Sequence, residues 1–231
     1  VQMVLWGFLT QFLAGQTSYV AQAFGVLLSG VLLWDVLFRG QLGVSISFFE
    51  DIWARNLGHL YVSPLRPYEM ICALMVMSLI RTVIGVVPAA VLAGVFFGFS
   101  VFSLGLSLVA FFTLLLVMGW SMGLLICGIV MRYGQGAESL AWALIFALAP
   151  LSGVYYPISV LPVWLQHFSA ALPSAYVFEG MRAILAQHQV RLDLLGQAAL
   201  LDLAYLAIGT AGFLAFFRIA RQRGQLLQQG E

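Results

Sequence analysis

Lysine is absent from this sequence, and charged residues of either sign are scarce. Ten arginines and nine acidic residues make up only 8% of the 231 residues, whereas 62% are hydrophobic and the mean hydropathy is +1.01. This leaves too little polar surface to cover a water-soluble globule. The solvent around most of the chain must therefore be lipid.

Motifs for several kinds of catalysis are also missing. A phosphate-binding loop of the GxxxxGK[ST] type needs a lysine, so the chain cannot hydrolyse ATP alone. His59, His167 and His188 form neither an HExxH nor an HxxxH pair, and the apolar segments hold no histidine that could serve a serine nucleophile as general base. No DxxxD cluster offers a metal to a lipid phosphotransferase. We expect no catalytic residue, metal site or cofactor in this chain.

Cysteine is rare, which limits the part that disulfides can play. Cys72 and Cys127 both lie in apolar sequence and share no CxxC spacing. A disulfide framework or a zinc site is therefore not indicated. We expect both side chains to pack in a protein core.

Long uncharged runs dominate what is present, and the longest extends over residues 82–131. A membrane-spanning helix needs about 20 apolar residues, and these runs lack the alternation of polar and apolar residues that barrel strands show. The sequence predicts an all-α polytopic membrane protein with six transmembrane helices. The predicted segments are 1–14, which is incomplete, 19–38, 69–97, 103–131, 139–157 and 194–217.

The arginines predict the orientation of these spans, because basic residues are retained on the cytoplasmic side. With the C-terminal tail inside, two arginines, Arg182 and Arg191, lie outside, and a third, Arg81, falls within a span. The other seven lie inside, at positions 39, 55, 66, 132, 218, 221 and 223. We expect a multi-pass protein of the bacterial cytoplasmic (inner) membrane.

The first long connection, on the predicted cytoplasmic side, contains an amphipathic segment over residues 47–62. Its apolar and polar residues fall on opposite faces at helical spacing, and Asp51 and Arg55 stand four apart, so they can pair. We expect a short helix at the membrane surface. The apolar face comprises Phe48, Phe49, Ile52, Trp53, Leu57 and Leu60, and the polar face Glu50, Asp51, Arg55 and His59.

The second long connection is too apolar for an ordinary exposed loop. Prolines at positions 150, 157, 162 and 173 divide it into pieces of about ten to fifteen residues, each too short to cross a bilayer. Residues 158–190 are predicted to form short re-entrant or interfacial helices on the outer side. Four aromatic residues are expected in an interfacial belt, namely Tyr155, Tyr156, Trp164 and Tyr176. A hydrophobic plug with no role in transport is the alternative.

Three ionisable residues fall inside or beside predicted spans. Asp35 lies near the inner end of its span, four residues before Arg39, and is expected to form a local pair at the interface. Arg81 is expected to reach the interface or a polar cavity. Asp202 can be a coupling-ion site or can pair with a neighbouring helix, because such residues are costly in lipid and often mark a transport pathway.

The order of these features resembles the ABC-2 type transporter permeases. The resemblance rests on FEDIWARNLGHLYVSPL at residues 49–65 and on PLSGVYYP at residues 150–157, followed by Leu161-Pro162 and Leu172-Pro173. It covers nearly the whole chain, which would form a single transmembrane domain over residues 1–231. The amphipathic helix that precedes the first span in that family is not found, and we expect it to lie before Val1.

The resemblance implies a permease subunit of an ATP-driven exporter that works by alternating access. It implies two copies of this chain in a homodimer, two copies of a separate ABC ATPase that binds ATP and Mg, and no nucleic-acid partner. The coupling helix at 47–62 would contact the ATPase, and an outer gate would involve Tyr155, Tyr156, Pro157 and Trp164. The ATPase contact would comprise Glu50, Asp51, Trp53, Arg55, Asn56 and His59.

Three classes of function stay open. A permease driven by a separate ATPase is favoured, with an amphipathic, lipid-like, glycan or drug substrate. An ion-coupled secondary transporter or channel that uses Asp202 or Arg81 is the second class. A membrane-embedded enzyme is the third.

Overall fold

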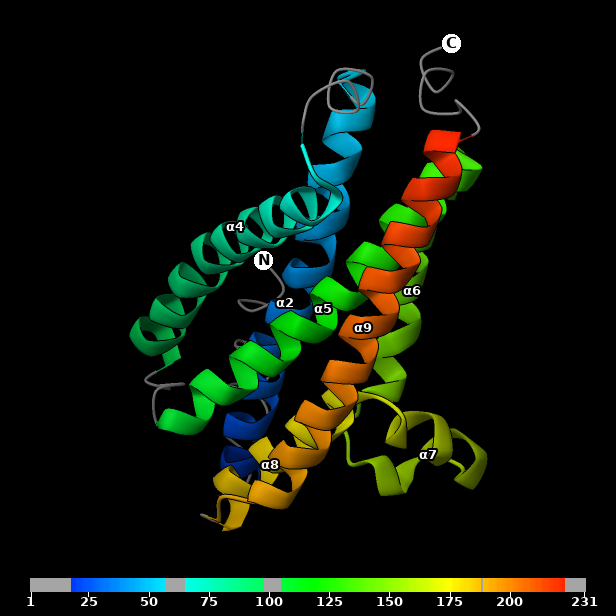
Figure 1. Cartoon of the computed structure of the whole chain (residues 1–231). Coiled ribbons are helices and arrows are strands. Elements are labelled where there is room, and N and C mark those ends of the chain that lie inside the picture. The colour runs from blue at the N-terminus through cyan, green and yellow to red at the C-terminus, as the bar shows by residue number, and fades with distance from the viewer. Residues whose placement is uncertain (1–17, 57–64, 98–104, 188, 223–231) are drawn as a thin grey trace. The chain divides into compact units, whose positions relative to one another are not determined.

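The computed structural model describes residues 18–56, 65–97, 105–187 and 189–222, and these residues form helices and turns without any strand (Figure 1). The chain is all-α, as the sequence predicts. The elements are α2 (Ser18–Trp53), α4 (Pro67–Phe97), α5 (Leu106–Tyr133), η2 (Gln135–Ala137), α6 (Ser139–Leu151), η3 (Ile158–Val160), α7 (Val163–Ala170), α8 (Pro173–Gln187) and α9 (Leu192–Gln222).

Four helices of the described residues are long and apolar enough to cross a membrane. The candidate spans are Val26–Trp53, Pro67–Phe96, Leu106–Tyr133 and Leu192–Gln222. The helix α6 has 13 residues, fewer than the roughly 20 that a span needs. The predicted segment 1–14 lies outside the described residues, so the count of six spans stays a prediction.

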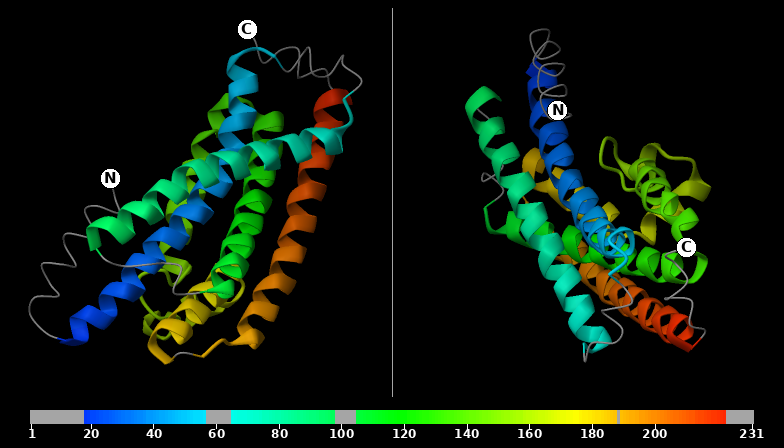
Figure 2. Two further views of the ribbon diagram at one scale, coloured as in Figure 1. Left: turned by 90° about the vertical axis from the view of Figure 1, so that its left-hand side faces the viewer. Right: turned by 90° about the horizontal axis from the view of Figure 1, so that it is seen from above.

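The helix α2 does not end near residue 38, as expected, but continues without interruption to Trp53 (Figure 2). Gln41 lies in this stretch and is fully buried, and its Nε2 donates to the Ala141 carbonyl in α6 at 3.2 Å. Because a neighbouring helix accepts this hydrogen bond, the polar residue does not require a break in α2. The expected separation between the second span and a surface helix at 47–62 is therefore wrong for residues 47–53, and residues 57–64 lie outside the described residues.

The end of α2 is set by backbone hydrogen bonds rather than by glycine. The Arg55 N–H donates to the Ile52 carbonyl and the Asn56 N–H to the Asp51 carbonyl, both at 2.9 Å. These two bonds form a Schellman motif, whose left-handed position is usually glycine. Here Arg55 occupies that position with φ 55°. The chain thus leaves the helix at a residue that bears its full side chain.

The start of α4 follows a common N-terminal pattern. Pro67 stands at the first helical position, where the missing N–H is not needed. The Glu69 carboxylate accepts a hydrogen bond of 2.7 Å from the backbone N–H of Arg66. This reach from the third helical residue back to the N-cap is half of a capping box. Pro67 thus begins α4.

The helices contribute to two compact units. Unit 1 comprises Val1–Leu37, Val83–Leu115 and Leu148–Leu201, and unit 2 comprises Phe38–Thr82, Leu116–Ala147 and Asp202–Glu231. Residues from α2, α4, α5, α6 and α9 occur in both units, because the division falls within each of these helices.

Unit 2 has a continuous apolar core. Buried side chains from α2, α4, α5, α6 and α9 form it, and Phe48 of α2 meets Phe213 of α9 edge to face with ring centroids 6.3 Å apart. Cys127 is buried in this core, as expected, but Cys72 is exposed, so the prediction for Cys72 is wrong. Cys72 lies on the side of α4 that faces away from the unit 2 core.

Three helices of unit 2 meet at one hydroxyl group. The Ser78 Oγ of α4 donates to the Gly40 carbonyl of α2 at 2.8 Å and accepts from Trp120 Nε1 of α5 at 3.1 Å. The helices α5 and α9 also approach closely, because a Cβ at Gly209 would overlap the Ser121 carbonyl oxygen. Small residues at such positions let membrane helices pack backbone to backbone.

The apolar connection in unit 1 folds into the short helices η3, α7 and α8 (Figure 1). Pro157 and Pro162 are the N-cap residues of η3 and α7, and Pro173 is the first residue of α8. The fixed φ of proline suits the start of a helix. Pro150, which was expected to break the chain, lies inside α6 one residue before its end.

Candidate functional site

The last turns of α2 carry three of the six predicted ATPase-contact residues, Glu50, Asp51 and Trp53. Glu50 lies here, and its Oε2 pairs with Nη2 of Arg81 in α4 at 2.5 Å. Both side chains keep contact with solvent or lipid, with exposed fractions of 50% for Glu50 and 34% for Arg81. The structure gives the Arg81 charge a partner on the neighbouring helix. The expectation that Arg81 reaches an interface or a polar cavity stays a prediction.

A second polar contact joins the end of α2 to the turn before α6. Trp53 Nε1 donates to Glu138 Oε1 at 3.0 Å. The indole ring is exposed and was expected on the apolar face of a surface helix. Since its N–H finds a carboxylate, Trp53 links α2 to the segment that leads from α5 into α6. The two contacts together tie the end of α2 to α4 and to the start of α6.

The apolar side of this segment is covered by protein. Phe48, Phe49 and Ile52 are buried in the unit 2 core rather than lying on a membrane surface. The sequence could not distinguish these cases, because an apolar helix face looks the same whether it faces lipid or other helices. The buried side holds the end of α2 firmly, so its polar side has a defined direction.

The remaining predicted contact residues have different outcomes. Asp51 forms no ion pair with Arg55 within the described part of the chain, because Arg55 lies beyond the helix end in a left-handed conformation. Arg55 and Asn56 are both exposed. His59 lies outside the described residues. The assignment of these six residues to an ATPase contact stays a prediction.

The predicted gate residues lie around η3 and α7 in unit 1. The Tyr156 hydroxyl donates to the Pro150 carbonyl at 2.8 Å, which holds this ring against the end of α6. Tyr155 is 38% exposed, and partial desolvation raises the pKa of its phenol above the ordinary value. Trp164 is exposed on α7, and Pro157 begins η3. Their role as a gate stays a prediction.

Arg182 is the residue of this region that the sequence interpretation missed. Its Nη1 donates to the Gly153 carbonyl at 2.6 Å, and its Nη2 pairs with Glu179 at 2.8 Å within α8. Its side chain is only 14% exposed. Gly153 has φ +68°, a conformation that favours glycine. The spacing of Glu179 and Arg182 was a signal for the pair, but the bond to Gly153 depends on tertiary structure.

Asp202 lies on the buried side of α9 and is 2% exposed. Neither carboxylate oxygen has a hydrogen-bond partner among the described residues. A carboxylate in such surroundings is costly, which makes the residue a candidate for function. No group of three or more His, Cys, Asp or Glu side chains within the described ranges could hold a metal ion.

A comparison with protein families identifies the family of this chain. The profile of the ABC-2 type transporter family matches residues 1–186. The chain belongs to the ABC-2 type transporter family. No curated protein matches it.

As an ABC-2 type permease, the chain is a multi-pass membrane protein and a subunit of an ABC transporter. The family domain is a permease and not a catalytic domain, and it associates with an ABC ATPase. The end of α2 lies inside the matched range, and so do Arg81, Glu138 and Arg182. Asp202 lies beyond it.

Proposed function

We propose that this permease is the membrane subunit of an ATP-driven exporter in the bacterial cytoplasmic membrane. It moves an amphipathic, lipid-like, glycan or drug substrate outward by alternating access. Two copies pair as a homodimer with two copies of the ATPase, which bind ATP and Mg. The observation that carries the proposal is the polar end of α2, which is tied to two other helices in a chain of this family.

The proposed coupling starts at this end of α2. The exposed residues Arg55 and Asn56 and the segment up to residue 62 contact the ATPase. Movement of the contact passes through α2 to α4 by the Glu50–Arg81 pair, and to the start of α6 by the Trp53–Glu138 bond. ATP can shift the spans only if the ATPase contact differs in free energy between the two arrangements of the helices.

The Arg182 contacts support the proposed outer gate. The guanidinium joins α8 to the turn after α6, next to the predicted gate residues Tyr155 and Tyr156. A hydrogen bond to a charged donor stabilises this turn by about 1.5–3 kcal/mol. The gate would therefore open by a movement of α8 with the turn, or by loss of this bond.

The first experiment measures capture of a candidate ABC ATPase encoded beside this gene. The permease in detergent carries Arg55→Asn, which removes the charge and keeps a residue that tolerates the left-handed conformation. Arg191→Asn is the matched control, since Arg191 is an exposed arginine predicted on the opposite side of the membrane. We expect Arg55→Asn to weaken capture and to lower ATP-dependent movement of a fluorescent phospholipid in proteoliposomes, whereas Arg191→Asn leaves capture unchanged.

Failure of the wild-type chain to capture any ABC ATPase, in the presence or absence of nucleotide, would contradict the proposal. If both variants lose capture equally while remaining monodisperse, the end of α2 is not the ATPase contact.

An ion-coupled transporter is the second candidate, and the buried Asp202 carboxylate favours it. Under that alternative, a proton or sodium gradient drives transport without ATP, and Asp202→Asn abolishes it. Under the exporter proposal, an ionophore leaves ATP-dependent transport intact. Arg81 does not serve the alternative well, because its charge is paired with Glu50.

A further inference from the structure

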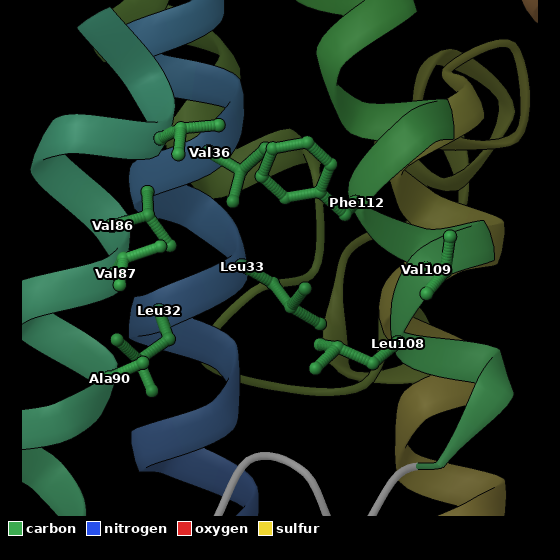
Figure 3. A pocket seen from close by; sticks show the side chains of 10 residues that line it. Leu32, Leu33, Val36, Val86, Val87, Ala90, Leu108, Val109 and Phe112 are labelled. Atoms are coloured by element: carbon green, nitrogen blue, oxygen red, sulfur yellow. The ribbon is translucent and has the colours of Figure 1, made fainter. Parts of the chain in front are cut away.

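A cavity of about 230 Å³ lies in unit 1 between α2, α4 and α5 (Figure 3). Ten side chains line it, and all of them are aliphatic or aromatic. In Figure 3, Leu33 and Val36 of α2 lie between Val86 and Val87 of α4 on one side and Phe112 of α5 on the other.

Water is a poor occupant of this cavity. A buried water molecule needs two to four polar partners, and no lining side chain offers one. Thr113, which follows the lining residue Phe112, uses its hydroxyl within α5 by donating to the Val109 carbonyl at 2.8 Å. An engineered apolar cavity of about 150 Å³ holds benzene or xenon, so this larger cavity has room for a hydrocarbon group.

The cavity is open to the apolar outer surface of unit 1. Its lining residues Val83, Val87 and Val109 are also exposed, and Ile84 and Val91 continue the exposed apolar side of α4. Since α4 is a candidate membrane span, we infer that this exposed apolar side faces lipid. A hydrocarbon chain can therefore enter from the bilayer without passing a polar group.

A proline lies among the lining residues of α4. Pro88 stands between Val87 and Ala90 and has no N–H for the helical ladder. The Ile84 carbonyl therefore has no helical donor at this position.

We propose that this cavity binds one acyl chain of a bilayer phospholipid. The hydrophobic effect contributes little, because the bilayer interior is as apolar as the cavity. The stabilisation comes from dispersion contacts that an empty space would lack, since protein interiors are packed without such voids. An unbranched acyl chain suits a space that is open at one side and closed by buried side chains at the other. The site is independent of the proposed direction of transport and of the ATPase.

The test is photocrosslinking in nanodiscs made with a phosphatidylcholine that bears a diazirine at the end of one acyl chain. Leu33 and Val36 are 2% and 1% exposed, so a lipid on the outer surface cannot reach them. We expect mass spectrometry to find label on these two residues as well as on the exposed α4 side. Label on Val91 and none on Leu33 or Val36 would overturn the proposal, and would leave the cavity to a second copy or to apolar residues 1–14 of the chain itself.

Ala90→Phe places a ring in the cavity, and Val91→Phe makes a comparable enlargement at an exposed neighbour that does not line it. We expect Ala90→Phe to lower labelling of Leu33 about tenfold, because several methylene groups of the acyl chain lose their contacts, and Val91→Phe to leave it unchanged. Equal labelling in the two variants would overturn the proposal. If Ala90→Phe does not fold, the position of the label on the wild-type chain still decides.

Discussion

Arg81 of α4 and Glu50 of α2 form an ion pair of 2.5 Å between residues that are 31 positions apart. One was expected to lie in a membrane span and the other on a surface helix that contacts an ATPase. Their pairing links the end of α2 to the middle of α4.

Reversing this pair tests whether it transmits movement. Glu50→Arg and Arg81→Glu alone should each lower transport per ATP hydrolysed, and the double reversal should restore much of it. Both side chains are partly exposed, so the coupling energy in a double-mutant cycle should be only about 0.2–1 kcal/mol. Measurement needs coupled transport and thermal unfolding of all four proteins. A double reversal no better than the single variants would show that the pair is not a transmission contact.

Glycine positions on α9 should respond oppositely to the same substitution. Gly209→Ala places a Cβ against the Ser121 carbonyl and should destabilise the protein by about 1–3 kcal/mol. Gly196→Ala meets nothing within 4 Å and should stabilise α9 by about 0.5–1 kcal/mol. The midpoints of thermal unfolding in detergent should separate by several degrees, with wild type between them. A stable Gly209→Ala protein would mean that α5 and α9 can move apart freely.

Arg182→Ala should loosen the turn after α6. We expect a loss of about 1.5–3 kcal/mol from the hydrogen bonds to Gly153 and Glu179. Faster hydrogen exchange should be confined to residues 152–161, and Arg182→Lys should show a smaller effect because lysine lacks the planar fork. Arg191→Ala removes an exposed pair with Asp193 and serves as the control. Uniform exchange across the chain in Arg182→Ala would instead indicate global unfolding.

Arg55→Gly should stabilise the end of α2. The left-handed conformation costs a residue with a Cβ roughly 1–2 kcal/mol, and glycine avoids this cost. The gain in stability is smaller than that, because glycine loses more conformational entropy on folding. Arg55→Val should destabilise, because a β-branched residue fits this conformation worst. Thermal unfolding in detergent would measure both changes. A lower midpoint for glycine than for arginine would show that the Arg55 side chain makes a stabilising contact.

Several features of the protein could be predicted from sequence because they depend on local chemistry. The long uncharged runs require lipid-facing helices, and three of the six predicted segments, 69–97, 103–131 and 194–217, agree with α4, α5 and α9 to within about five residues. Prolines at 157, 162 and 173 mark the starts of the short helices after α6. The resemblance at residues 49–65 and 150–157 also led to the correct family.

The continuity of α2 could not be predicted, because it depends on a partner 100 residues away. From the sequence, a span would end at Arg39, Gly40 and Gln41, because a buried Gln41 amide would lack a hydrogen-bond acceptor. In the folded chain the Ala141 carbonyl is that acceptor, so the helix continues. Whether the apolar side of the helix at Phe48 faces protein or lipid could not be predicted either, because it too depends on the packing of distant helices.

The amino-acid sequence alone determined that this chain is an all-α membrane protein without a phosphate-binding loop, because composition and apolar length act locally. Tertiary structure alone decided that Glu50 meets Arg81, that Trp53 meets Glu138, and that Arg182 holds the Gly153 carbonyl. These contacts join residues 31, 85 and 29 positions apart. They exist only once the helices have packed, since packing decides which side of each helix faces protein and which faces lipid.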